Sequence, residues 1–132
     1  MVERNSEDPP RVVVVGGGVA GLTAATFTAR AGLDTAIVDG DDSILRRNAF
    51  LENVPGFPAG VNARRFLELN REQARRAGAL FEDGLVTGID QHAGEGDHLT
   101  VTVDDHDLLA EYVICTSWSN VDYLDGLDVS VT

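Results

Sequence analysis

The alternation of apolar and polar segments predicts strands and helices in turn along the first third of the chain. Residues 11–15 form a short β-branched run next to glycines, which is typical of a buried parallel strand. Residues 19–31 are small and helix-compatible, and Gly32 follows where a helix C-terminus favours a residue that tolerates positive φ. Residues 34–39 predict a second strand, so the segment indicates two parallel strands joined by a right-handed helical crossover.

The middle of the chain changes from loop to helix. Residues 40–60 are rich in proline and glycine and predict an irregular segment. Asn62 can cap a helix over residues 63–77, whose apolar side chains fall largely on one face, and Gly78 follows as a helix terminator. The short apolar segment at residues 79–82 predicts a third parallel strand.

The last strands have an antiparallel pattern. Residues 85–90, 99–104 and 108–116 alternate or run apolar, and polar turns separate them. The end of the third segment, EYVICT, is apolar enough to continue into the buried sheet. The pattern therefore predicts an α/β, Rossmann-like domain whose parallel sheet has the strand order 3-2-1-4, with a small antiparallel β-meander between its third and fourth strands.

Length and composition are those of one domain. The chain has 132 residues, of which 43% are hydrophobic, enough for a single core. We expect the Rossmann-like domain over residues 11–120, between a flexible N-terminal tail at 1–10 and a C-terminal tail at 121–132 without a clear pattern. The acidic, polar start and the short apolar runs predict neither a signal peptide nor a transmembrane helix, so we expect a cytoplasmic protein.

The charge balance is strongly acidic. The chain has 22 acidic residues against 10 basic ones and a net charge of -12, and all the basic residues are arginine. Molar salt shortens the screening length to about 3 Å and removes most of the self-repulsion. This composition resembles that of halophilic proteins from a salt-filled cytoplasm, although a mesophilic acidic protein without lysine is the alternative. In both cases the charge disfavours nucleic acid and anionic membranes as partners.

The stretch VVVVGGGVAG carries the clearest chemical signal. Gly16, Gly18 and Gly21 have the G-x-G-x-x-G spacing, which permits a tight turn, a close approach of a pyrophosphate and close packing of a helix. The motif lies between a predicted strand and a predicted helix, whose N-terminus favours phosphate groups. Asp39 ends the next strand, where a carboxylate can accept hydrogen bonds from a ribose. This context predicts a dinucleotide site.

Four segments together resemble the flavin-binding part of the thioredoxin reductase family of FAD-dependent pyridine nucleotide-disulfide oxidoreductases. They are VVVVGGGVAGLTAA, TAIVD, LENVPGFPAGV and GALFEDGLVTGI, and the resemblance covers residues 11–117. Ala25 and Gly32 extend the glycine pattern into one that resembles the long flavoprotein form. The third segment is the most specific, because its Glu-Asn-x-Pro-Gly sequence is similar to a family segment that passes beside the flavin.

The resemblance implies a role for several residues of an FAD site. The glycine turn would hold the pyrophosphate, Asp39 the adenosine ribose, and the backbone of Val86 the adenine. Asn53 would lie near the flavin or its ribityl chain, although it can also be a turn residue that bonds its own backbone. The expected cofactor-binding residues are Gly16, Gly18, Val19, Ala20, Gly21, Asp39, Gly40, Arg47, Asn53, Val86, Thr116 and Ser117.

The sequence also departs from the family. Cys115-Thr116-Ser117 stands in place of an Ala-Thr-Gly turn, and the serine puts close backbone approach there in question. In the family an NADPH domain with a C-x-x-C pair follows, and then a Gly-Asp segment that also binds FAD. This sequence has one cysteine and no second glycine motif, so we expect no disulfide reduction by the family mechanism.

Three functional hypotheses therefore remain. The first is a minimal FAD-binding oxidoreductase-like protein without a catalytic acid, base or nucleophile of its own, which exchanges electrons with a homodimer partner or a separate redox chain. The second is a non-catalytic nucleotide-binding module or subunit that retains the fold, with or without its cofactor. The third is an NAD-linked oxidoreductase, against which the Glu-Asn-x-Pro-Gly segment argues.

The charged clusters give weaker signals. His92, His98 and His106 lie among aspartates, but their spacing matches no known ligand pattern, so we expect no metal site. Half of the arginines lie in residues 64–76, where pairing with Glu68 and Glu72 on a solvated helix face is favoured over docking of an acidic partner or a phosphate. Two others, Arg46 and Arg47, lie closer to the predicted cofactor and can reach one of its phosphates or simply be exposed.

Overall fold

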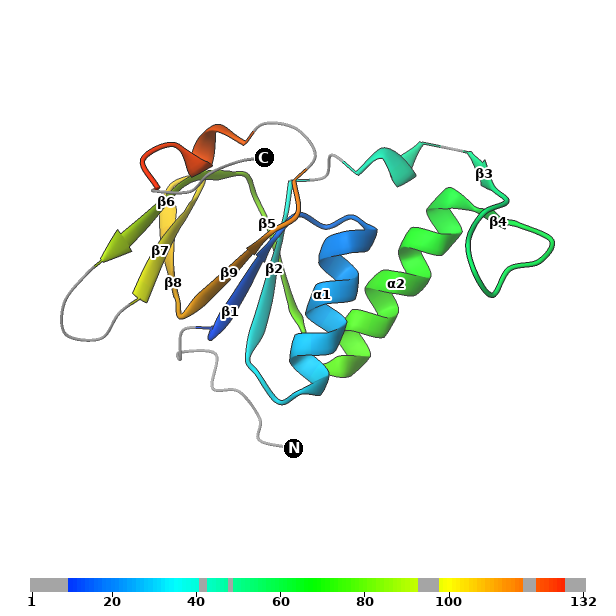
Figure 1. The fold of residues 1–132 in the computed structure, drawn as a ribbon, viewed down its shortest axis with the longest axis horizontal. Helices are drawn as coiled ribbons and strands as arrows, with labels where there is room; N and C mark the ends of the chain where they lie inside the picture. The colour runs from blue at the N-terminus through cyan, green and yellow to red at the C-terminus, as the bar shows by residue number, and fades with distance from the viewer. Residues whose placement is uncertain (1–9, 41–42, 48, 93–97, 118–120, 128–132) are drawn as a thin grey trace.

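Two layers cover the two faces of a central parallel sheet in the computed structural model, which describes residues 10–40, 43–47, 49–92, 98–117 and 121–127 (Figure 1). Helices lie against one face of the sheet and an antiparallel meander lies on the other side (Figure 1). No helix in these ranges is long and apolar enough to span a membrane. This arrangement is the predicted α/β, Rossmann-like fold.

The central sheet has the predicted strand order. Its strands are β1 (Val12–Val15), β2 (Thr35–Asp39), β5 (Leu80–Asp83) and β9 (Tyr112–Cys115). They lie in the order β5-β2-β1-β9, and every neighbouring pair is parallel. Since the carboxyl ends of all four strands meet at one edge, the loops that follow them gather there.

Two helices pack on one face of the sheet. The first, α1 (Val19–Arg30), crosses from β1 to β2, and the second, α2 (Ala63–Ala77), precedes β5. The side chain of Asn62 caps α2 by accepting hydrogen bonds from two backbone N–H groups, and Gly78 ends the helix with a φ of 108°. Both ends of α2 are therefore as predicted. The core on this face contains Val12, Val14, Leu22, Ala25, Ile37, Leu67, Ala74 and Ala79.

The meander covers the opposite face with β6 (Val86–His92), β7 (His98–Val103) and β8 (His106–Ala110). The single strand that we predicted at residues 108–116 is divided at Glu111, because β8 completes the meander and β9 joins the parallel sheet. The backbone N–H groups of Glu111 and Tyr112 donate to the carbonyl of Arg11, which fixes the crossing point. The core on this side contains Val13, Val15, Val38, Val86, Ile89, Val101, Val103, Ala110 and Tyr123.

The segment at residues 40–60, predicted as irregular, contains some regular structure, so that prediction was wrong in part. A short 3-10 helix, η1 (Ile44–Arg46), precedes the strand β3 (Phe50–Leu51), which pairs antiparallel with β4 (Val61–Asn62). Gly60 permits this pairing, since it has a φ of 84° and a Cβ there would lie 2.4 Å from the ring of Phe50. The pairing depends on that tertiary contact, and the local pattern of apolar and polar residues does not predict it.

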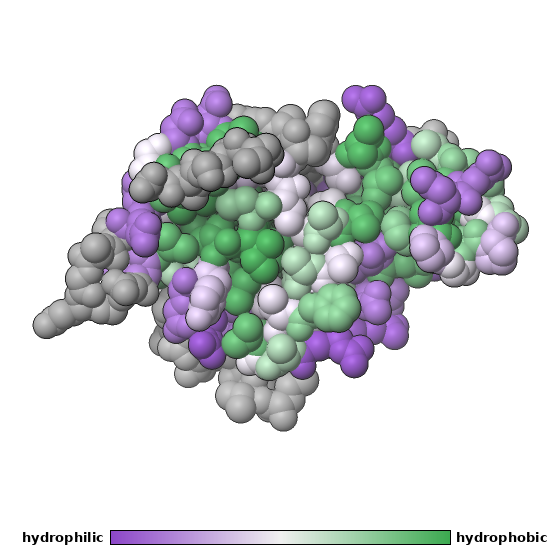
Figure 2. Space-filling model, in the orientation of Figure 1, coloured by the Kyte–Doolittle hydropathy of each residue, from purple (hydrophilic) through white to green (hydrophobic). Residues whose placement is uncertain are grey.

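The C-terminal segment has a structure that the sequence did not predict. A second 3-10 helix, η2 (Asp122–Leu124), buries Tyr123 in the core beneath the meander. Of the expected tails at 1–10 and 121–132, residues 1–9 and 128–132 lie outside the described residues. In the view of Figure 2, apolar surface gathers over the central sheet between the meander and the helices. Tyr112, on the edge strand β9, is exposed.

A contact between two ionisable side chains joins the meander to the parallel sheet. The imidazole Nε2 of His106 on β8 contacts a carboxylate oxygen of Glu82 on β5. A hydrogen bond to Glu82 raises the pKa of His106 above its ordinary 6.5, against an opposing effect of desolvation. A raised folded-state pKa means that the contact stabilises the fold fully below pH 6.5 and ceases to do so as the pH rises through the folded-state pKa.

We predict that an NMR titration gives His106 a pKa above 6.5, and that Glu82→Gln brings the pKa back toward that value. Glu111→Gln is the control, because Glu111 pairs with Arg11 and does not contact His106. An unchanged pKa of His106 in the Glu82 variant would contradict this assignment.

Candidate functional site

The turn between β1 and α1 is built from glycine because its backbone lies against other segments. A Cβ on Gly16 would lie 2.5 Å from Oγ1 of Thr116, and Gly16 has a φ of 111°. A Cβ on Gly21 would lie only 1.9 Å from the carbonyl oxygen of Gly16. These two glycines therefore let α1 begin directly under the end of β1, as the motif predicts.

The N-terminus of α1 faces an open groove. Gly18 is the N-cap with extended backbone, and no side chain caps the helix. The first N–H groups of a helix have no carbonyl partner four residues earlier, and they carry a partial positive charge. The groove, which we call the turn groove, has a volume of about 320 Å³. Its lining residues are Gly16, Gly17, Gly18, Val19, Ala20, Ser43, Ile44, Leu45, Thr116 and Ser117.

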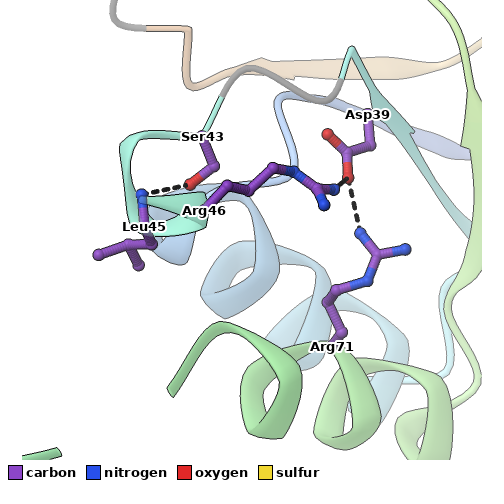
Figure 3. A network of polar contacts seen from close by, with 5 residues as sticks. All are labelled: Asp39, Ser43, Leu45, Arg46 and Arg71. Carbon is purple, nitrogen blue, oxygen red and sulfur yellow. Dashed lines mark hydrogen bonds and ion pairs between the residues drawn. The ribbon is translucent and has the colours of Figure 1, made fainter. Parts of the chain in front are cut away.

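Asp39 lies at the end of β2 with a side chain only 2% exposed. Its Oδ2 accepts from Nη2 of Arg46 at 3.1 Å and from Nη1 of Arg71 at 2.6 Å, and both guanidinium groups point toward this one oxygen (Figure 3). On its other side the carboxyl group packs against the glycine turn, because a Cβ on Gly17 would lie 2.3 Å from the carboxyl carbon. Asp39 is thus held between the turn and α2.

A second cavity opens where β2 and β5 end. This strand-end cleft has a volume of about 650 Å³. Asp39 and Gly40 form part of its wall, together with Arg46, Arg71, Asp83, Gly84, Leu85 and Asp104. Since Gly17 lines the turn groove and packs against Asp39, the two cavities adjoin at the carboxyl edge of the sheet. That edge is where open α/β sheets bind their ligands.

The structure brings most of the expected cofactor-binding residues to these two cavities. Gly16, Gly18, Val19, Ala20, Thr116 and Ser117 line the turn groove, and Asp39 and Gly40 line the strand-end cleft. Gly21 lies behind the groove, and buried Val86 follows Leu85 of the cleft. Arg47 and Asn53 are exposed and line neither cavity. The cofactor-binding role of every residue in the set stays a prediction.

The turn after β9 supplies hydroxyl groups to the groove. Thr116 donates a hydrogen bond from Oγ1 to the carbonyl of Val15 at 2.7 Å, and the hydroxyl of Tyr123 donates to Oγ of Ser117 at 2.9 Å. Burial is the main cause that raises the pKa of Tyr123. Desolvation likewise raises the pKa of neighbouring Cys115, so its thiol is neutral at pH 7. The serine at this turn is therefore accommodated, with Tyr123 as its partner.

One arginine of α2 has a role that we did not predict. Arg65 pairs with Glu68 and Arg76 pairs with Glu72, as expected for a solvated helix face. Arg71 instead turns inward to Asp39, and its guanidinium lies 4.6 Å from the ring centroid of Phe81. The sequence contained a signal for this role. Arg71 lies four residues after Leu67 and three before Ala74, so its charged side chain falls on the apolar face of the helix.

The histidines do not assemble a site in the part of the chain that the structure describes. No group of three or more histidine, cysteine, aspartate or glutamate side chains there can hold a metal ion. Asp97 and the side chain of His92 lie outside the described residues. His106 instead contacts Glu82 and Asp105.

Comparison with known proteins gives consistent matches. Residues 10–119 match the family described as pyridine nucleotide-disulphide oxidoreductase. A thioredoxin reductase from Aquifex aeolicus is 32% identical over 111 residues, which cover 80% of this chain and 33% of the relative. A thioredoxin reductase from Streptomyces clavuligerus is 36% identical over 98 residues, 72% of this chain and 30% of the relative.

Solved structures match as well. The atypical thioredoxin reductase TRi from Desulfovibrio vulgaris Hildenborough has a TM-score of 0.74 at 32% identity, over 86% of this chain and 38% of that protein. A thioredoxin reductase from Gloeobacter violaceus has a TM-score of 0.73 at 30% identity, over 80% of this chain and 36% of that protein. The chain therefore spans about a third of the length of the relatives that it matches.

The contacts of the glycine turn predict effects of different size on stability for two neighbouring substitutions. Gly17→Ala displaces the buried carboxylate of Asp39, and we expect a loss of about 1–3 kcal/mol in the free energy of unfolding. Gly18→Ala meets only Oγ of Ser43, at an ordinary 3.5 Å, so we expect a change of less than about 1 kcal/mol. Urea unfolding measures both values, and equal stability of the two variants would contradict the assigned packing.

Proposed function

The chain belongs to the pyridine nucleotide-disulphide oxidoreductase family, and on that premise we propose that it binds FAD at the carboxyl edge of its parallel sheet. It corresponds to part of the flavin domain of thioredoxin reductase-like proteins. In this proposal the turn groove takes the pyrophosphate and the strand-end cleft takes the adenosine. The chain's own residues bind and orient the cofactor, which supplies electron transfer when bound.

The observation that carries this proposal is the environment of Gly18. Packing accounts for Gly16, Gly17 and Gly21, because a Cβ on each would meet another segment at less than 3.0 Å. A Cβ on Gly18 would have no neighbour closer than 3.5 Å, so packing within the fold does not require glycine at this position. Gly18 lines the open turn groove beside uncapped N–H groups of α1. A glycine there fits a ligand phosphate that approaches the backbone.

The residues around both cavities fit the two ends of such a ligand. Backbone N–H groups at Val19, Ala20 and Gly21 would donate to the pyrophosphate, because the helix dipole favours negative charge there. Asp39 and Gly40 would meet the adenosine ribose in the strand-end cleft, and the backbone at Val86 would meet the adenine. We keep Arg47 and Asn53 as proposed contacts of the phosphate and the flavin.

The proposed function also includes an electron-transfer partner. We propose that the flavin exchanges electrons with a second copy of the chain or with a separate redox chain. The acidic, lysine-free composition favours a salt-rich cytoplasm as the setting, since high salt screens the net charge of -12.

The test is FAD binding by purified protein in molar KCl. We expect a yellow protein with flavin absorption bands, or uptake of added FAD by the colourless protein. Gly18→Ala places a methyl group in the turn groove and should weaken FAD binding about tenfold or more, with the fold intact.

Gly88→Ala is the matched control, because the same change on the meander meets no atom closer than 3.9 Å. A folded wild-type protein that fails to take up FAD would overturn the proposal. Equal FAD affinity of the wild type and the Gly18→Ala variant would contradict the placement of the pyrophosphate in the turn groove.

A further inference from the structure

We propose that Arg71 is a positioning residue of the FAD site, which fixes the carboxylate of Asp39 at the wall of the strand-end cleft. Arg71 comes from α2, thirty-two residues further along the chain than Asp39, and the family resemblance assigned it no role. The proposal rests on the proposed function, because it concerns how tightly the adenosine half of the cofactor is held. It depends on three features of the structure.

The first feature is the difference between the two arginines that contact Asp39. Nη1 of Arg71 lies 2.6 Å from Oδ2, against 3.1 Å for Nη2 of Arg46. The side chain of Arg71 is 23% exposed, whereas that of Arg46 is 38% exposed and belongs to a 3-10 helix of three residues. Arg71 projects from a helix of fifteen residues that is capped at both ends. Of the two, Arg71 is therefore the more rigid support for the carboxylate.

The second feature is what holds the guanidinium of Arg71 itself. It lies 4.6 Å from the ring centroid of Phe81, which belongs to β5 beside β2. Stacking on an aromatic face restricts the guanidinium and adds an attraction between the cation and the ring. The central sheet and α2 thus place the guanidinium before any ligand binds, so little conformational entropy is lost in holding Asp39.

The third feature is the contact on the opposite side of the carboxylate. The backbone of Gly17 leaves no room for even a Cβ between the turn and Asp39. Arg71 and Gly17 therefore clamp the carboxylate from two sides, in a cleft that Asp39 and Arg71 both line. Without Arg71, the buried carboxylate of Asp39 keeps the longer contact with Arg46. The position of the carboxylate at the cleft wall is then no longer fixed.

Arg71→Met tests this role, because methionine keeps an unbranched apolar side chain near Phe81 and removes the charge. We expect FAD to bind about tenfold more weakly than to the wild type, as for the loss of one well-placed polar contact. Arg71→Lys keeps the positive charge and should recover most of that loss. Arg75→Leu is the matched control, since Arg75 also lies over the ring of Phe81, at 5.2 Å, and Asp39 is held by Arg71.

The decisive readout is a double-mutant cycle with Asp39→Asn, measured as FAD dissociation constants in molar KCl. If Arg71 acts through Asp39, Arg71→Met has no further effect in the Asp39→Asn background. The same fold-loss in both backgrounds would overturn the proposal, because Arg71 would then act independently of Asp39. Unchanged affinity of Arg71→Met would also overturn it. If Arg71→Met does not fold, the cycle is run with Arg71→Gln, which also removes the charge that contacts Asp39. A wild-type protein that does not bind FAD would instead refute the proposed function itself.

Discussion

The buried carboxylate of Asp39 is the constraint on which the arrangement of the site depends. A charge that is removed from water must be neutralised and hydrogen-bonded, or the fold would lose several kcal/mol. Arg46 and Arg71 meet this requirement from two different elements. Their contacts connect η1 and α2 to the end of β2. Because all three side chains line the strand-end cleft, the same contacts hold the walls of the cleft in place. The cleft and the fold are thus stabilised by the same ion pairs.

The glycine turn adapts to the same carboxylate. Gly17 is glycine because Asp39 occupies the space of its Cβ, and Gly16 and Gly21 are glycine because of Thr116 and the turn itself. Gly18 differs from the other three, since nothing in the fold occupies the space of its side chain. Within one motif, the glycines that packing requires can therefore be distinguished from the one that it does not require. That one is Gly18, the second glycine of the pattern, and its position in the turn groove fits a role in ligand binding.

The sequence predicted those features that depend on local patterns. The strand order, the meander, the caps of α2 and the gathering of the glycine turn and Asp39 at one edge follow from periodicity, capping residues and motif spacing. The pairing of β3 with β4 was missed, because it depends on a contact between Gly60 and Phe50. Arg71 was assigned to solvent with its neighbours, because its partner lies far away in the sequence and its place on the apolar face of α2 was not used.

An NMR titration of the labelled protein with FAD tests most directly the claim that the turn groove and the strand-end cleft form one nucleotide site. The account predicts shifts in the backbone amides from Gly16 to Gly21, together with the amide of Gly40 and the side-chain Nε–H of Arg71. Amides of β7 on the meander should remain unchanged. Shifts confined to the meander, or shifts in the turn without any at Gly40 and Arg71, would contradict the account.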